Sequence, residues 1–478
     1  MNGDATRVLL EETNLSFSDA AVCLHFQERL PSVVAHETVE PYDGCAVLQS
    51  MERDLLSLAF QQDPPVESHC LNQDGREPTP IEVVFPETYS FYSEGREEQR
   101  RCVQQIRKAN AMVSYSYFRH SRTKVWHLAL VPDNDVFTEL DIIRLIHLYA
   151  GGGERSSIAE KLRFNVSGLS FRQDELLAAL VSDLRWEGLP IPTAEGLELQ
   201  GGTVSIVTRG DVSKVLETTR RARQGETDAA NQFDQWMEKQ DAEWRTVLSL
   251  CGIVTGIFDF VEVDEQEALD TLQPTFSSSD AFYRINRNTF VKIAKDDRAH
   301  VLSRATMGIS PYLAIPHAVL IHNAANVENA EKELVRALGH TRRSVDRMER
   351  ARGVAERRLQ HLYVPNVFNY ETERTLYERG REQRGDTDRL AAVTSKLDEL
   401  LSALKAAWDL QHDRGQKRIA MLVIFISAMQ LQESIASDAG GRKWLSWGIA
   451  LVLGGVFAWA VYNLWGSRRV IGRWRGKR

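Results

Sequence analysis

The sequence lacks the features that mark several large classes of protein. It has only five cysteines in 478 residues, and no two of them form a CxxC pair, which excludes a disulfide framework and favours a reducing compartment. No positively charged, apolar leader opens the chain, so we predict no signal peptide. GxSxG, HExxH and the GK[ST] ending of a Walker A loop are also absent. The sequence therefore nominates no enzyme and no catalytic residue.

Charge is distributed unevenly along the chain. The charged fraction of 26% excludes a protein of many membrane spans, and the net charge of -8 argues against direct nucleic-acid binding. Residues 414–478 nevertheless carry eleven Lys and Arg against two Asp and Glu, a net of +9, whereas residues 1–413 carry a net of -17. The sequence thus predicts an acidic body followed by a basic C-terminal segment.

Two apolar stretches in the basic segment predict a transmembrane hairpin. Residues 444–465 have no formal charge and are long enough to cross a hydrocarbon core of ~30 Å, and residues 419–437 form a shorter candidate span. Basic residues precede the first stretch and follow the second, so the positive-inside rule places both termini in the cytoplasm. The outer loop is then 438–443 and the tail is 466–478. We expect a multi-pass protein of the inner (plasma) membrane.

The first predicted span carries polar residues on one stripe, at spacings of three and four. Polar groups in a span usually face a bundle interior or water, so several copies would line a pore with this stripe. The pore-lining candidates are Val423, Ser427, Gln430, Ser434 and Ser437, and the candidates for an acidic outer mouth are Glu433 and Asp438. Alternatively, the serines and glutamine only join two helices by hydrogen bonds.

A heptad pattern precedes the first span, within residues 370–418. Apolar residues recur for about three heptads, which predicts a stalk helix through which copies associate into a homo-oligomer. The stalk candidates are Leu390, Leu397, Leu401, Leu404 and Trp408. The alternative is a single amphipathic helix docked on its own domain. Gly385 is placed to interrupt the helix, and residues 316–369 predict an earlier, long and highly charged helix.

The front of the chain predicts an α+β domain over residues 76–315, which we expect in the cytosol. Strand patterns occupy 81–85 and 203–208, and 111–118 with 124–131 reads as a hairpin. Helical patterns cover 211–250 and 282–294. Residues 1–75 show no clear pattern, and we assign them no structure.

Two groups of residues have side chains that bind metals. An acidic cluster without EF-hand spacing consists of Asp133, Asp135, Glu139 and Asp141. A loop followed by a helix N-terminus explains it, and a divalent regulatory site at Asp133 and Asp135 is the alternative. His317 and His322 are five residues apart, which does not place them on one helical face, so we predict no metal site between them.

The order of these segments resembles the CorA-type divalent cation transporters, above all over residues 390–478. The resemblance implies a homopentameric, CorA-like funnel with the first span lining the pore, and Mg²⁺ as the divalent cation. That family carries a Gly-Met-Asn motif at the outer end of the first span, and this chain does not. Ala428, Met429 and Gln430 form a degenerate counterpart, which puts magnesium selectivity in question.

CorA-like proteins without the motif are found as membrane effectors in bacterial defence systems, where a nucleotide signal acts on the cytosolic domain. The resemblance therefore implies an oligomeric ion channel or transporter gated through that domain, and an antiviral effector that permeabilises the membrane. Its partners would be membrane lipid, copies of itself and a nucleotide second messenger. The alternative, from another class, is a membrane-anchored cytosolic receptor or scaffold without conduction.

Overall fold

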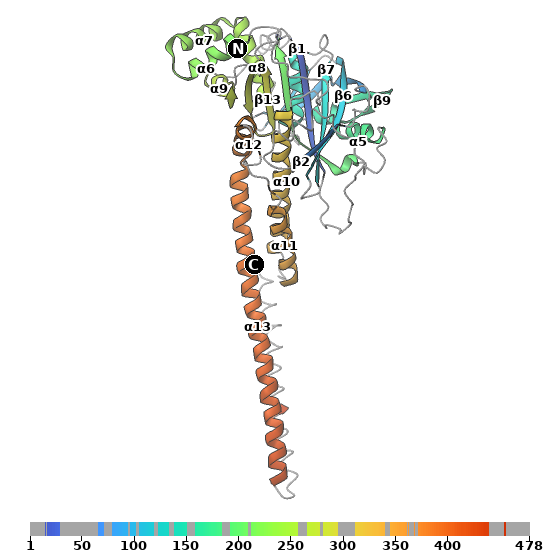
Figure 1. Ribbon diagram of the computed structural model, residues 1–478, viewed down its shortest axis with the longest axis vertical. Coiled ribbons are helices and arrows are strands. Elements are labelled where there is room, and N and C mark those ends of the chain that lie inside the picture. The colour runs from blue at the N-terminus through green and yellow to red at the C-terminus, as the bar shows by residue number, and fades with distance from the viewer. Residues whose placement is uncertain are drawn as a thin grey trace. The chain divides into compact units, whose positions relative to one another are not determined.

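A computed structural model of the chain gives its architecture (Figure 1). The structure describes residues 15, 17–28, 66–70, 79–93, 96–101, 105–118, 123–132, 138–150, 158–183, 192–208, 212–256, 265–277, 281–294, 311–339, 345–360, 362, 368, 371–438 and 454–455. It divides into two units. The first unit contains residues 1–336 and 353–396, and the second contains residues 337–352 and 397–478.

The first unit is built around an eleven-stranded mixed sheet. Its main path runs β11-β12-β13-β10-β1-β7-β6-β3-β8-β9, with β2 paired to β6, and β4 and β5 form a separate two-stranded sheet. Among the described pairings, β10 with β13 is parallel and the others are antiparallel. The strands are β1 (Phe17–Glu28), β2 (Val66–Cys70), β3 (Thr79–Phe85), β4 (Thr88–Ser93), β5 (Arg96–Arg101), β6 (Gln105–Phe118), β7 (Thr123–Pro132), β8 (Arg163–Val166), β9 (Leu169–Phe171), β10 (Leu197–Thr208), β11 (Phe276–Ser277), β12 (Ala281–Ile285) and β13 (Thr289–Ala294).

Helices surround the sheet, and they are mostly short in the first three hundred residues. They are α3 (Glu139–Ala150), α4 (Ile158–Lys161), α5 (Gln173–Asp183), the 3-10 turn η2 (Ala194–Gly196), α6 (Ser213–Arg223), α7 (Thr227–Lys239), α8 (Ala242–Thr255) and α9 (Glu265–Thr271). The start of α8 shows why these bounds arise, because the carboxylate of Asp241 accepts a hydrogen bond from the Trp244 backbone N–H. Gly256 ends the same helix at a φ of 68°.

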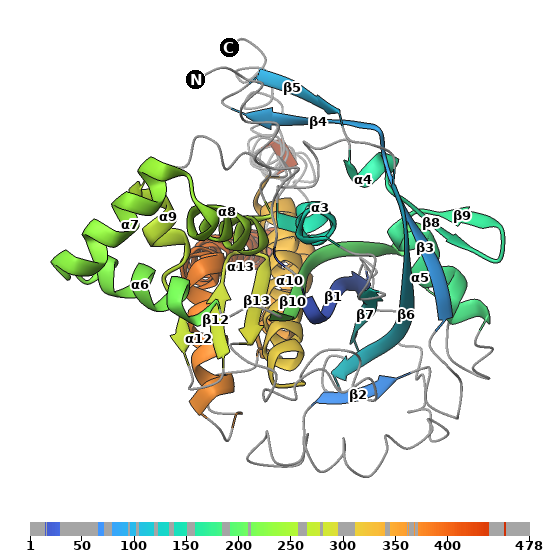
Figure 2. The same ribbon diagram turned by 90° about the horizontal axis from the view of Figure 1, so that it is seen from above.

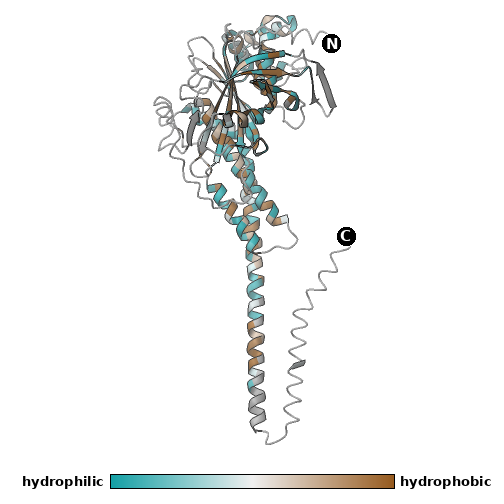
Figure 3. Ribbon diagram, turned by 90° about the vertical axis from the view of Figure 1, so that its right-hand side faces the viewer, coloured by the Kyte–Doolittle hydropathy of each residue, from teal (hydrophilic) through white to brown (hydrophobic). Residues whose placement is uncertain are grey.

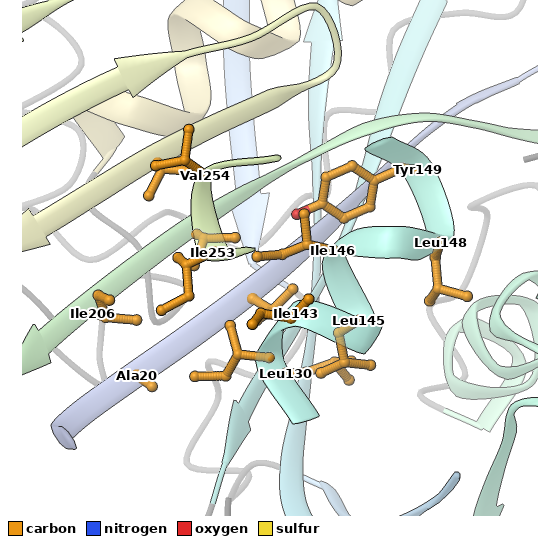
Figure 4. Packing of buried hydrophobic residues seen from close by; sticks show 14 of the residues in the cluster. Ala20, Leu130, Ile143, Leu145, Ile146, Leu148, Tyr149, Ile206, Ile253 and Val254 are labelled. Carbon is orange, nitrogen blue, oxygen red and sulfur yellow. The ribbon is translucent and has the colours of Figure 1, made fainter. Parts of the chain in front are cut away.

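Two hydrophobic cores lie against the sheet, and the period-two alternation of β1 separates them. Ala20, Val22 and Leu24 belong to the larger core, which includes side chains of α3, α5 and α8. In Figure 4, Ile143 of α3 lies near Leu130 of β7, and Ile146 lies near Tyr149. Ala21 and Cys23 point to the other face and belong to the second core, with side chains of α10 and α12. The sheet is therefore covered on both faces.

Four longer helices follow the sheet: α10 (Pro311–Gly339), α11 (Val345–Gln360), α12 (Glu371–Arg384) and α13 (Asp386–Asp438). Figure 2 shows α10 and α12 beside β12, β13 and β10. Gly385 interrupts the helical conformation between α12 and α13. Its φ of 68° is a conformation that glycine adopts without strain. At a rise of 1.5 Å per residue, the 53 residues of α13 make a helix about 80 Å long.

Several local predictions are confirmed. Strand 81–85 lies in β3, strand 203–208 lies in β10, and 111–118 pairs with 124–131 as β6 and β7. The helical pattern of 211–250 corresponds to α6, α7 and α8. The helix predicted at 282–294 is wrong, because these residues form most of the β12–β13 hairpin. Asn286 and Asn288 lie in its turn, where the Asn286 backbone N–H donates to the Thr289 carbonyl at 2.9 Å.

The predicted transmembrane hairpin needs correction. Within the part of the chain that the structure describes, no helix is long and apolar enough to cross a membrane. Residues 419–437 do lie in a helix, α13. Their apolar run is short, however, since Gln430, Gln432 and Glu433 follow it, and a span needs about 20 apolar residues. Of the predicted span 444–465, only 454–455 are among the described residues.

The wider interpretation built on that hairpin changes with it. The fold class of an α+β domain with a two-helix membrane hairpin and a CorA-like funnel is wrong for the described chain, which instead has a large mixed sheet with helices on both faces. The description as a membrane protein and ion channel, and the multi-pass inner-membrane localisation, rested on the same two spans. The described residues give neither of them any support.

Candidate functional site

The buried face of the sheet beneath α10 carries a group of polar side chains. Cys23 and His25 alternate with apolar residues on β1, so both point to this face. His127 of β7 is the register partner of His25, and Thr203 of β10 is the register partner of Cys23. All four residues are buried. The pairing of three strands therefore brings together residues that are up to 180 positions apart.

Hydrogen bonds hold the two imidazoles in fixed orientations. The Nδ1 atoms of His25 and His127 face each other at 2.7 Å. On their far sides, the Nε2 of His25 lies 3.2 Å from the hydroxyl of Thr203, and the Nε2 of His127 lies 2.8 Å from the hydroxyl of Ser116. The Sγ of Cys23 lies 3.8 Å from the Nδ1 of His25. Two ring nitrogens and one sulfur atom thus converge on a common point.

A third histidine reaches this group from α10. The ring centroids of His317 and His25 are 4.9 Å apart, with the rings nearly perpendicular, and His317 stacks on Phe290 at 4.3 Å. Both ring nitrogens of His317 are buried and have no hydrogen-bond partner among the described residues. Gly201 leaves room for the ring, because a Cβ there would lie 2.9 Å from the His317 Nε2.

Burial controls the protonation of the group. It lowers the pKa of His127 to about 3, and it lowers the pKa of His25 well below its ordinary value, with further lowering by His127 and His317. Burial also lowers the pKa of His317, to which the positive charge of Arg384 adds. The pKa of the Cys23 thiol is raised, again by burial. The three imidazoles are therefore neutral at pH 7, and their nitrogen lone pairs are available as acceptors or metal ligands.

Donor-atom spacing marks this group as a place where a metal ion fits. Among the described residues, Cys23, His25 and His127 each offer one ligand atom, and the three atoms lie within 4.8 Å of one another. His317 is outside this closest set but beside it. Without an ion, the same groups can form a hydrogen-bonded chain from Ser116 through His127 and His25 to Thr203.

The two α10 histidines discussed from the sequence have different surroundings. His317 faces the Cys23–His25–His127 group, whereas His322 stacks on Phe118 at 4.0 Å. The Asn326 side-chain amide lies 3.0 Å from the His322 Nε2. Each histidine therefore has its own set of neighbours, on α10 and on the strands beneath it.

The acidic cluster is only partly described. Asp133 and Asp135 lie outside the described residues. Asp141 is buried in the first turn of α3 and accepts hydrogen bonds from the Thr138 backbone N–H at 3.0 Å and from the Arg107 Nε at 2.8 Å. Glu139 accepts a hydrogen bond from the Leu15 backbone N–H at 3.2 Å. These contacts match a helix N-terminus and its counter-charge.

The stalk and pore candidates all lie on α13. Leu404 is buried, Leu390, Leu397 and Leu401 are half-buried, and Trp408 is exposed. Of the pore candidates, the exposed ones are Val423, Ser427 and Gln430. The side chains outside the description are those of Ala428, Met429, Glu433, Ser434, Ser437 and Asp438. A role in conduction for any of them stays a prediction.

Sequence reasoning missed the histidine group, although one signal was present. Cys23-Leu24-His25 has the alternation that puts a thiol and an imidazole on one face of a strand. That stretch lies in the first 75 residues, to which the sequence analysis assigned no structure. His127 was visible only as part of a hairpin, and its partnership with His25 depends on strand order.

Comparisons with protein families, with characterised proteins and with solved structures find no match to this chain. The resemblance to CorA-type transporters, and with it Mg²⁺, the pentamer and the nucleotide signal, therefore stays a prediction from the sequence.

Proposed function

We propose that this chain is a self-associating scaffold, in which α13 joins copies of the chain. One observation carries the proposal: large apolar side chains remain exposed along one face of α13. We call this the α13 face and define it as Trp408, Ile419, Leu422, Val423 and Ile426, all of which are about half exposed or more.

The α13 face continues a stripe that is buried earlier in the same helix. Val393, Leu400 and Leu404 are buried within the chain. Trp408 follows Leu404 by four residues, and Ile419 follows Trp408 by eleven, which is about three turns. Ile419, Leu422, Val423 and Ile426 have the i, i+3, i+4, i+7 spacing of one helical face. Among the described residues, the chain thus buries the first part of the stripe and leaves the second part exposed. Figure 3 shows a brown, hydrophobic stretch in the lower half of α13.

A second copy of the chain is the occupant that this face fits. Every copy carries the same apolar stripe, so parallel association around an axis buries like against like. Polar and charged residues flank the stripe, including the exposed i, i+4 ion pair of Asp413 and Lys417 at 2.7 Å. The pattern is that of a helix seam with a solvated border.

The size of the α13 face sets the expected strength. Burying the exposed half of one such side chain stabilises a complex by about 1 kcal/mol. The five side chains of the α13 face therefore contribute about 5 kcal/mol per copy and about 10 kcal/mol per pair. Association costs roughly 4–15 kcal/mol in lost freedom. Leu410 and Ile424 are also exposed on α13 and add apolar area outside this face. For a pair the gain exceeds the cost by about 6 kcal/mol at most, which corresponds to a Kd of tens of micromolar, so association should appear in that concentration range or above it.

The test is the mass of the full chain in solution, measured by analytical ultracentrifugation over a concentration series. We expect the unaltered chain to form a multimer and Leu422→Glu combined with Ile426→Glu to sediment as a monomer. Leu169→Glu is the matched control, since Leu169 is 63% exposed on the β8–β9 hairpin and should keep the multimer. The same measurement gives the number of copies.

Two results would contradict the proposal. One is an unaltered chain that stays monomeric throughout the series, or a double variant that keeps the multimer. The other is a monomeric chain that co-sediments with phospholipid vesicles and loses that binding in the double variant, because the α13 face would then serve lipid rather than a second copy.

A further inference from the structure

The facing Nδ1 atoms of His25 and His127 can hold either a proton or a cation between them. A hydroxyl both donates and accepts, so Ser116 can donate to the His127 Nε2, His127 can donate from Nδ1 across 2.7 Å to His25, and His25 can donate from Nε2 to Thr203. When both rings instead donate from Nε2 to the two hydroxyls, both buried Nδ1 lone pairs face each other, which is the arrangement that binds a cation.

The spacing of the donor atoms fits a cation. Ligand atoms about 2.0–2.3 Å from a tetrahedral zinc ion are roughly 3.3 Å apart for two nitrogens and roughly 3.6 Å apart for nitrogen and sulfur. The corresponding distances are 2.7 Å between the Nδ1 atoms and 3.8 Å between the Cys23 Sγ and the His25 Nδ1. To place all three donors on one ion, the two Nδ1 atoms would move apart and the Cys23 sulfur, which lies within 4.8 Å of the His127 donor, would move closer to it.

The surroundings match the needs of a buried ion. His317 has two buried ring nitrogens without a partner among the described residues, so it is the neighbouring group from which a fourth ligand would come. Its ring is held by the stack on Phe290, and Gly201 leaves it space. The second-sphere hydroxyls of Ser116 and Thr203 fix the tautomers of the two histidine ligands, as such partners commonly do.

We propose that Cys23, His25 and His127, with His317 beside them, bind one transition-metal ion of the Zn²⁺ class in a closed, structural site. A sulfur and nitrogen donor set suits Zn²⁺ and its borderline neighbours, whereas Mg²⁺ and Ca²⁺ require oxygen ligands that this set does not offer. On binding, the Cys23 thiol gives its proton to solvent and the thiolate bonds to the ion. Burial alone disfavours that thiolate, so the ion supplies the charge that stabilises it.

The site would link strands that are distant in the sequence to the helix that covers them. Cys23 and His25 lie on β1, His127 lies on β7, and His317 lies on α10. An ion held between them ties the middle of the sheet to α10. Metal removal should therefore loosen the packing of α10 before it unfolds the sheet's opposite face, where α3 and α8 form the larger core.

The test begins with the metal content of the full chain purified from zinc-supplemented cells, measured by plasma mass spectrometry. We expect about one zinc per chain and, after exchange into Co²⁺, the visible spectrum of tetrahedral cobalt with a thiolate charge-transfer band. Cys23→Ser should abolish that band. Zinc affinity should fall at least about tenfold in Cys23→Ser and in His127→Asn. Cys251→Ser, the other described buried free cysteine, is the matched control and should change neither readout.

The cobalt spectrum of the unaltered chain keeps the test decisive even where a variant folds poorly. A chain that carries no zinc after supplementation and gives no tetrahedral cobalt spectrum overturns the proposal. Zinc bound with equal affinity by Cys23→Ser and the unaltered chain also overturns it, because the ion would then lie elsewhere. Circular dichroism of each variant, recorded with a chelator, separates loss of the site from loss of the fold.

Discussion

Acidification should destabilise the first unit, because its histidine group is buried in the neutral form. His25, His127 and His317 all have folded-state pKa values below the ordinary value of 6.5, and that of His127 is about 3. A group whose folded pKa is depressed binds more protons when unfolded, so each of these histidines destabilises the fold as the pH falls below 6.5. For His127 the loss continues until the pH approaches 3.

The size of the effect follows from linkage. For His127, which stays neutral in the fold until the pH approaches 3, the loss of stability between pH 7 and pH 5 is about 2 kcal/mol. The folded-state pKa values of His25 and His317 are also depressed, so both residues add to this loss in the same direction. Domains of this kind are stable by about 5–15 kcal/mol. The unit should therefore lose a substantial part of its stability by pH 5.

Urea denaturation at pH 7, 6 and 5, followed by circular dichroism in the presence of a chelator, measures this slope directly. His127→Gln removes one titrating group, so its loss of stability between pH 7 and pH 5 should be smaller by about 2 kcal/mol. Ser402→Ala is the control, because Ser402 is exposed on α13 and the change neither adds nor removes a titrating group, so it should leave the slope unchanged. A slope that is equal in the unaltered chain and in His127→Gln would refute the reasoning.

Two further predictions concern single contacts that position the site. Gly201→Ala should destabilise the fold by roughly 1–3 kcal/mol in thermal unfolding, since the new Cβ would lie 2.6 Å from the Asn288 carbonyl oxygen and 2.9 Å from the His317 Nε2. Gly168→Ala is the comparison, because a Cβ there meets nothing within 4 Å but φ is 83°. Its effect measures backbone strain alone, so the two variants separate strain from the packing cost. Asp141→Ala should lower the free energy of unfolding by about 2–3 kcal/mol, because α3 loses its N-terminal cap and Arg107 loses its partner. Asp141→Asn should restore the cap alone and so recover part of that stability. If both variants lose the same stability, the cap contributes nothing.

The local elements were predictable where one face of a strand or helix is buried. Strands in β3, β6, β7 and β10 and the helices α6 to α8 follow from alternation and from 3.6-residue periodicity, which are properties of neighbouring residues alone. The β12–β13 hairpin was mistaken for a helix because the segment is short, and its apolar residues fit both the 3.6-residue period of a helix and the two-residue period of a strand. Sheet pairing decided between them, since the backbone groups of β13 bond to β10 and β12.

The stalk shows both alternatives left open by the heptad pattern. Val393, Leu400 and Leu404 are buried within the chain, as expected of a helix docked on its own protein, whereas Trp408 and the residues of the α13 face are not. A heptad reports that a face is apolar and does not report which surface covers it. The apolar run that begins at Ile419 was predicted to be a membrane span because an apolar sequence does not show whether lipid or protein covers it. The polar residues from Gln430 onward make this run too short for a span.

By itself, the sequence determined the strands in β3, β6, β7 and β10, the helices α6 to α8 and the apolar stripe along α13. Only the tertiary structure decided that His127 stands opposite His25 and that His317 closes over them. The physical reason is that strand order and helix docking are set by which buried surfaces fit together across the whole chain. A metal site or polar cluster built from β1, β7 and α10 exists only once those surfaces have met.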